Sequence, residues 1–294
     1  MRVSDSVIFQ NATQNTQAAE SAVQRATEVA STGLKVQTPS DAPSAAGLIV
    51  TYSMQSTRYT AIASGAQAAS SELSAASSAL NDISTQLSQA KQLAMEYASS
   101  GTSQQSAAGV TQANSILSQI LADLNTSFGN RYLFGGTLDG APPFDAAGNY
   151  QGNASVRQVE IAPGVYEPSS VDTSTSILGS GGGTNVVTAL QSLSTAIASN
   201  DPTQVQAVIS SLDASINQVA GASAQAGVSM STFNSAVTTA TQTASNYTKA
   251  TSNLSDADVV ASSIALQAAQ TALQASLSAT AQSFKLSLVD YLPS

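Results

Sequence analysis

Three segments of the sequence contain residue types that occur in metal-binding or phosphate-binding sites. Ser255-Asp256-Ala257-Asp258 places two carboxylates close together, whereas Asp139, Asp145 and Asn149 lie among glycines. The second group lacks the spacing of a calcium loop, where oxygen ligands recur at alternate positions before a glycine, so turn formation explains it better. In the first group, a serine N-cap followed three residues later by an acid predicts the start of a helix at residue 255.

The third segment, Gly179–Thr184, is rich in glycine but lacks the Gly-Lys-Ser/Thr sequence of a phosphate-binding loop, so a flexible linker is the better interpretation. The chain contains no cysteine and no histidine. It therefore has no thiol nucleophile, no imidazole base and no disulfide. Its acidic residues are scattered singly and form no recognisable pair for acid–base catalysis. We expect a protein that is not an enzyme and needs no cofactor or metal.

The composition of the 294-residue chain is unusually poor in charge. Charged residues make up 9 % of the sequence, against about 25 % in typical proteins, and the net charge is -9. No run of basic residues supports binding to nucleic acid. The first residues contain no apolar signal region, and no stretch of about 18 apolar residues predicts a membrane span. We expect a protein that is cytoplasmic or exported without a cleaved signal.

The elements that would position any site are long helices. From Leu48 to Tyr97, apolar residues recur in alternating steps of three and four, broken only at Gln55. This period of 3.5 residues is typical of a helix that supercoils against partner helices. A helix from residue 44 to 100 would be roughly 85 Å long. Tyr52 and Tyr59 lie on this stripe, as does Tyr97, and are expected in the core.

Further helices are predicted to complete an antiparallel bundle. A second apolar stripe runs from Ile209 to Leu254, in a helix that Asp201-Pro202 would begin. Shorter helices are expected at residues 104–128 and 185–198. Between residues 129 and 183 the sequence becomes rich in glycine and proline. Alternation around Val156–Ile161, followed by Pro163-Gly164, predicts a β-hairpin there.

The two ends of the chain carry apolar stripes that are expected to pack against each other and against neighbouring copies. The N-terminal stripe is poor in large side chains and ends at Gly33, where the helix is predicted to stop. Since burying it would stabilise the helix less than ordering its backbone costs, both end helices are expected to fold on assembly. The residues expected at the assembly interface are Ile8, Ala19, Ala22, Val29, Leu266, Leu273, Leu277, Phe284, Leu288 and Tyr291.

The predicted fold is mainly α, an antiparallel bundle or coiled coil of long helices with a small β-rich insertion. We expect three domains. A terminal helical assembly domain would combine residues 1–40 with 255–294, and a helical bundle would combine residues 41–130 with 184–254. The small variable domain would occupy residues 131–183.

Four stretches of the chain resemble the flagellin superfamily of bacterial flagellar proteins, and within it the family of hook-associated protein 3. They are the opening Met1–Ser4, the turn Gly33–Pro43, the segment Tyr132–Phe144, and the C-terminal helix at Ala272–Leu277 with its ending Ser287–Leu292. In the second stretch, Ala42 replaces the second aspartate of the family's P-S-D-D-P turn. The third resembles the family's Y-L-F-x-G-T…P-F, and the fourth its S-L-x-D-Y-L.

This resemblance implies a structural subunit at the junction of hook and filament. It implies export without a cleaved signal, an extracellular place in the flagellum, and a chaperone on the C-terminal helix. The implied partners are identical subunits, hook-associated protein 1 and flagellin. A filament flagellin with a short variable domain remains an alternative. A more distant alternative is a surface-binding module, in which Phe144, Tyr150 and Tyr166 of the insertion would form an aromatic patch.

Overall fold

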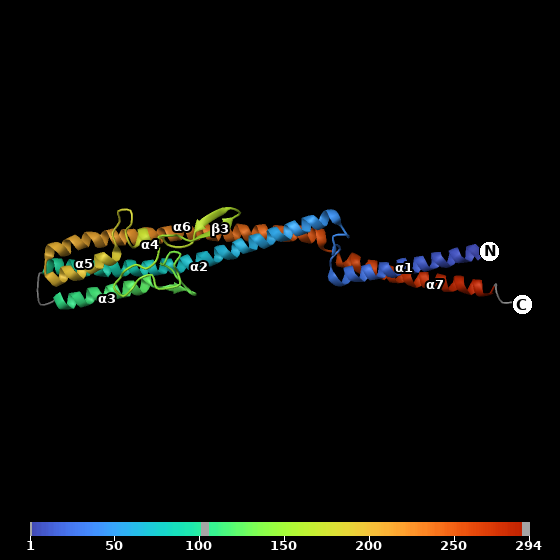
Figure 1. The fold of residues 1–294 in the computed structure, drawn as a ribbon, viewed down its shortest axis with the longest axis horizontal. Coiled ribbons are helices and arrows are strands. Elements are labelled where there is room, and N and C mark those ends of the chain that lie inside the picture. Colours follow the sequence, from blue (N-terminus) through green and yellow to red (C-terminus); the bar gives the residue numbers. More distant parts are fainter. Residues whose placement is uncertain (1, 101–105, 290–294) are drawn as a thin grey trace. The chain divides into compact units, whose positions relative to one another are not determined.

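A computed structural model describes residues 2–100 and 106–289 of the chain (Figure 1). The chain divides into two compact units, one formed by its two ends, up to Thr57 and from Ala244, and the other by Arg58–Thr243. Helices α2 (Pro43–Ser100) and α6 (Pro202–Ser255) contribute to both units. Within the described residues the fold is mainly helical with two small hairpins, as the sequence predicts. No described helix is both long and apolar enough to cross a membrane.

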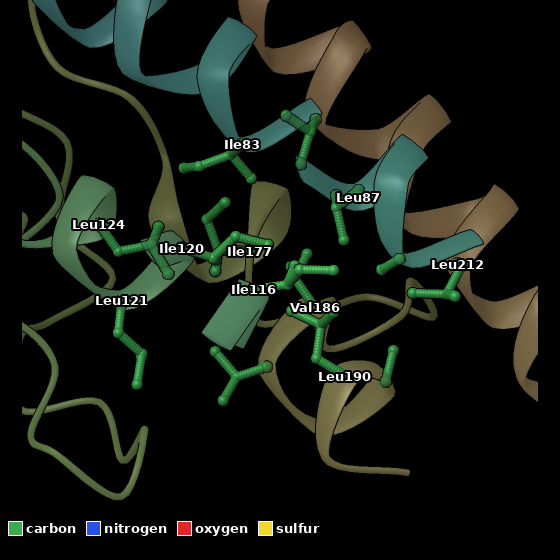
Figure 2. Packing of buried hydrophobic residues seen from close by; sticks show 14 of the residues in the cluster. Ile83, Leu87, Ile116, Ile120, Leu121, Leu124, Ile177, Val186, Leu190 and Leu212 are labelled. Atoms are coloured by element: carbon green, nitrogen blue, oxygen red, sulfur yellow. The ribbon is translucent and has the colours of Figure 1, made fainter. Parts of the chain in front are cut away.

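The central unit is a helical bundle around an apolar core. Helices α3 (Ser106–Leu124) and α5 (Val186–Ser199) pack against each other, and both contribute to a core shared with α2 and α6. Figure 2 shows Ile83 and Leu87 of α2 near Ile116 and Ile120 of α3, with Leu190 of α5 close by. The stripe predicted for α2 is buried in this unit, at Ile62, Ala66, Ala69, Leu73, Ala76, Leu80, Ile83, Leu87, Ala90 and Ala94.

Helices α2 and α6 run antiparallel in the central unit. Ser70 Oγ donates to Asn234 Oδ1 at 3.1 Å, and further along α2 Lys91 Nζ lies 2.6 Å from Asp213 Oδ1. The residue number of the partner on α6 falls as the residue number on α2 rises, so the two helices are antiparallel. As predicted, α6 begins at Pro202, where the Asp201 carboxylate accepts hydrogen bonds from the first turn.

Helix α3 ends four residues earlier than the predicted boundary at Phe128, so that part of the prediction is wrong. After Leu124 the side chain of Asn125 accepts from Phe144 N–H and donates to Phe144 C=O, both at 2.9 Å. The chain then turns into strand β1 (Ser127–Phe128), which pairs with β2 (Arg131–Tyr132). The predicted start at residue 104 lies outside the described residues.

The insertion contains the predicted hairpin, formed by β3 (Gln158–Ala162) and β4 (Val165–Pro168). It also contains a short helix, α4 (Thr173–Ser176), that the sequence pattern does not indicate. The glycine run forms a closed turn instead of an open linker. Gly183 N–H donates to Gly179 C=O at 2.9 Å, and Gln218 of α6 exchanges two hydrogen bonds with the Thr184 backbone.

The unit formed by the chain ends contains α1 (Arg2–Thr32) and α7 (Val259–Val289), which run side by side (Figure 1). Gly33 ends α1 with a φ of +71°, as predicted. The predicted serine cap is wrong, because Ser255 is the last residue of α6. Asp258 caps α7 instead, since its carboxylate accepts from the N–H groups of Val260 and Ala261. The three-domain division with boundaries near residues 40 and 255 stays a prediction.

Candidate assembly surface

The pairing of α1 with α7 creates no buried core. Every described side chain of the two helices is half-buried or exposed. The half-buried positions of α7 recur every three or four residues, at Ser262, Leu266, Ala269, Leu273, Ser276 and Thr280. Those of α1 follow the same spacing, apart from the adjacent Ala22 and Val23, and consist mostly of alanines. Helices in folded domains normally bury an apolar stripe completely, so this pair has surface left to cover.

The expected interface residues fall into three groups. Ala19, Ala22 and Val29 of α1 are half-buried, as are Leu266 and Leu273 of α7. Leu277, by contrast, is 49 % exposed. The side chains of Ile8, Phe284 and Leu288, as well as the whole of Tyr291, lie outside the described part of the chain.

The contact between α1 and α7 contains hydroxyl groups that the apolar stripe does not predict. Thr16 Oγ1 lies 3.4 Å from Ser276 Oγ and 3.5 Å from Thr280 Oγ1. Sequence periodicity places Asn15 on this stripe, but the structure turns Asn15 outward and puts its neighbour Thr16 inside. Small polar side chains therefore replace large apolar ones in the contact, which lowers the apolar area that the two helices bury.

Several large apolar side chains of the pair face outward, and the predicted interface omits most of them. Val259 is 73 % exposed, and the set also contains Val7, Phe9, Val260 and Ile264. Val259, Val260 and Ile264 lie together at the start of α7, where such an exposed apolar group marks a surface for a partner, whereas Val7 and Phe9 lie near the start of α1. The signal in the sequence is the Val259-Val260 pair directly after the Asp258 cap, because a stripe with steps of three and four residues does not need two adjacent large apolar residues.

The connectors between the helices are tied together by backbone hydrogen bonds. Lys35 N–H donates to Ser255 C=O at 2.7 Å, and Ala257 N–H donates to Gly33 C=O at 2.8 Å. Lys35 Nζ also reaches Asn253 C=O at 2.9 Å, near the C-terminus of α6, where a cation is favoured. Hydrogen bonds from Ser255 and Ser252, and then the charge of Lys35, hold the pKa of Asp256 below its usual value.

Asp41 organises the turn in which Ala42 departs from the family pattern. Its carboxylate accepts from Thr38 N–H at 2.7 Å and from Gln37 N–H at 3.0 Å. These two hydrogen bonds, that from Thr38 first, lower the pKa of Asp41. The turn is thus made by the aspartate that the chain retains.

The remaining sequence candidates have structural roles. Asp145 Oδ1 accepts from Ala147 N–H and Asn149 N–H, as its predicted turn role requires. Phe144 is buried and packs against half-buried Tyr150 at a ring distance of 5.1 Å, which leaves Tyr166 as the exposed member of the suggested aromatic patch. That patch is therefore not formed.

One groove of about 440 Å³ lies between the insertion and α6, lined by Leu73, Val156, Val171, Ala222 and Ala226 among others. Several of its polar side chains are engaged within the protein. Ser229 Oγ donates to Glu167, and the Asp172 carboxylate caps α4. No described group of three or more acidic residues is arranged to hold a metal ion.

Comparisons with known proteins agree with this architecture. The model of the bacterial flagellin N-terminal helical region matches residues 3–139, and that of the flagellin C-terminal helical region matches residues 209–292. Among curated proteins, none matches the sequence.

Solved structures share the fold at low sequence identity. A protein of Vibrio parahaemolyticus described as a flagellar hook-associated protein is 21 % identical, with a TM-score of 0.66 over 74 % of this chain and 100 % of that chain. FlgL of Bacillus cereus is 18 % identical, with a TM-score of 0.55 over 67 % of this chain and 99 % of its own. Hook-associated protein 3 of Legionella pneumophila is 11 % identical, with a TM-score of 0.58 over 70 % and 97 %. Since the two flagellin models together match most of the sequence, the chain belongs to the bacterial flagellin family.

Proposed function

We propose that this protein is a non-enzymatic structural subunit of the bacterial flagellum that joins the hook to the filament. The observation that carries the proposal is the pair of α1 and α7, which exposes large apolar side chains and has no fully buried residue among those described. Helices in proteins gain most of their stability from packing of an apolar face. The pair therefore needs neighbouring molecules to cover it.

The mechanism is folding coupled to assembly. Copies of this chain, hook-associated protein 1 and flagellin would cover the outward apolar residues of α1 and α7. Before assembly, an export chaperone would shield the C-terminal helix. The subunit would leave the cell without a cleaved signal and act outside it. Support for the junction role comes from the names of the solved structures with this fold and from the terminal sequence motifs.

Electron microscopy of the purified full chain under salting-out conditions tests the proposal. We expect monomers or short rings that do not extend but dock onto isolated hooks bearing hook-associated protein 1. Long regular filaments of this protein alone would contradict the junction role. The same micrographs would then support a filament flagellin, which the match to both flagellin helical regions makes the second candidate.

A further inference from the structure

Four charged side chains meet where the insertion lies on α2 in the central unit. Glu72 of α2 accepts hydrogen bonds from two arginines, from Arg131 Nη2 at 3.0 Å and from Arg157 Nη2. Asp139 Oδ2 accepts from Arg157 Nη1 at 2.5 Å and lies 3.9 Å from Arg131 Nε. Acidic and basic groups therefore alternate in this set, named here the Glu72 cluster, and its formal charge is zero.

The cluster is buried at its centre. Glu72 is 5 % exposed, and the Arg157 side chain is also largely inaccessible, whereas Arg131 reaches solvent. Removing two charges from water costs about as much as their attraction returns, so a buried ion pair adds little net stability. Loss of one partner is costly because the other charge stays buried without compensation.

One carboxylate thus holds both hairpins of the insertion. Arg131 belongs to β2, and Arg157 directly precedes β3. The backbone of Arg157 is itself fixed, since its N–H donates to Ser170 Oγ at 3.0 Å and its C=O accepts from Ser169 N–H at 2.8 Å. Movement of Arg157 would therefore move the segment after β4 as well.

We propose that the Glu72 cluster is a latch that selects one docked arrangement of the insertion on α2. Arg131 and Arg157 are the only basic residues between positions 129 and 183. A shift by one helical turn along α2 would place them near Ala68 or Ala76, neither of which can accept a hydrogen bond through its side chain. Both arginines would then lose Glu72, and the largely buried Arg157 would keep only Asp139, which moves with the insertion, as a charged partner. The apolar contacts of the insertion beside the cluster, where Val159 and Ile161 of β3 pack against the core that contains Leu73, carry no comparable directional requirement.

Hydrogen exchange of the full chain, read by mass spectrometry in peptides covering residues 156–171, tests the latch. Glu72→Gln should speed exchange there at least about tenfold, because it leaves two arginines without their carboxylate. The matched control is Arg58→Gln, which breaks the exposed Arg58–Glu160 ion pair, 3.0 Å long, that also joins α2 to β3. Exchange in the control should stay within about twofold of the parent, as exposed pairs contribute little.

A second variant keeps the test decisive if Glu72→Gln fails to fold. Glu72→Leu combined with Arg157→Leu replaces the buried pair with apolar groups, which preserves stability in many proteins. If the Glu72 cluster acts as a latch, this double variant should keep a near-parental Tm but exchange fast in residues 156–171. The reason is that apolar contacts do not fix the position of the insertion on α2. Parental exchange in this double variant, or unchanged exchange in Glu72→Gln, would overturn the proposal.

Discussion

At the scale of single residues, close packing between α2 and α3 restricts what can replace a glycine. Gly109 of α3 lies against the ring of Tyr97, and a Cβ added at Gly109 would overlap that ring. Overpacking usually costs about 1–3 kcal/mol, and the gain in helix propensity offsets about 1 kcal/mol of this cost. We therefore expect Gly109→Ala to lower the free energy of unfolding by up to about 2 kcal/mol. Urea denaturation followed by circular dichroism measures the difference.

The chain supplies its own control for this substitution. Gly227 lies inside α6, and a methyl group added there would meet no neighbouring side chain within 4 Å. Gly227→Ala should therefore raise the free energy of unfolding by up to about 1 kcal/mol. Equal effects of the two substitutions would show that the Tyr97 contact is unimportant.

The start of α7 gives a second prediction for a single residue. Asp258→Ala removes the acceptor for Val260 N–H at 2.8 Å and Ala261 N–H at 3.1 Å. The expected loss is about 1 kcal/mol in local helix stability, visible as faster amide exchange at these two residues. Ser255→Ala, the control, should leave their exchange unchanged, because Ser255 Oγ donates within α6 and to Asp256. Faster exchange only in the serine variant would restore the capping role expected from sequence.

At the scale of elements, the contact between α2 and α3 includes an imperfect polar pair. Gln86 Nε2 donates to Asp123 Oδ2 at 2.7 Å, while the buried Oε1 of Gln86 has no hydrogen-bond partner. Burial raises the pKa of Asp123, opposed by this hydrogen bond and reinforced by the charge of Asp82. The charged carboxylate is therefore disfavoured in the folded protein.

Asp123→Asn should stabilise the protein at neutral pH, because it removes the charge and its amide can donate to Gln86 Oε1. The rise in Tm should not exceed about 2 °C, since the site keeps partial access to water. The pKa of Asp123 is higher in the folded protein than in the unfolded chain. The folded protein therefore loses stability as the pH rises from the unfolded-state pKa to the folded-state pKa. The advantage should hence disappear in acid, where Asp123 is protonated. Melting curves at pH 7 and pH 3 check this, and an equal gain at both values would contradict the electrostatic cause.

Sequence periodicity predicts the elements well wherever a helix buries a regular stripe. The stripe of α2 is buried at the expected positions from Ile62 to Ala94. Element ends depend on contacts between distant residues, which periodicity does not contain. The end of α3 is set by Asn125 with Phe144, and the glycine turn is fixed by Gln218, 34 residues beyond Thr184. Periodicity does not indicate the Glu72 cluster for the same reason, since its side chains come together from positions 72 to 157.

At the scale of the whole molecule, assembly should depend on outward apolar residues that the single chain does not need. Leu277 is half-exposed on α7, so Leu277→Asp should block docking onto hooks while the central bundle keeps its helical circular dichroism and Tm. Ser278→Asp adds the same charge at the next exposed position and removes no apolar group. It should dock like the parent chain in the same micrographs. Normal docking of the leucine variant would contradict the proposed role of α7.

The sequence predicts which helices form the candidate surface better than it predicts which side chains are exposed on it. Leu266 and Leu273 carry the same apolar character as Leu277, yet only Leu277 is mostly free of α1. In that turn of α7, Ser276 occupies the half-buried position, and its Oγ lies 3.4 Å from Thr16 Oγ1. The apolar stripe of one helix does not show how the partner helix is rotated about its own axis.

The antiparallel pairing of α2 with α6 has a consequence for synthesis on the ribosome. Ser70 bonds with Asn234, and Ser77 with Ser223, across separations of 164 and 146 residues. At a translation rate of 5–20 residues per second, the partner of Ser70 is made roughly 10–30 s later. Until then, the part of the α2 stripe that packs on α6, at Ala66, Ala69 and Leu73, lacks this partner. Contacting residues are thus further apart in this sequence than is usual for a helical protein. We therefore expect slow folding, in which α2 and α6 pair only when the chain is nearly complete.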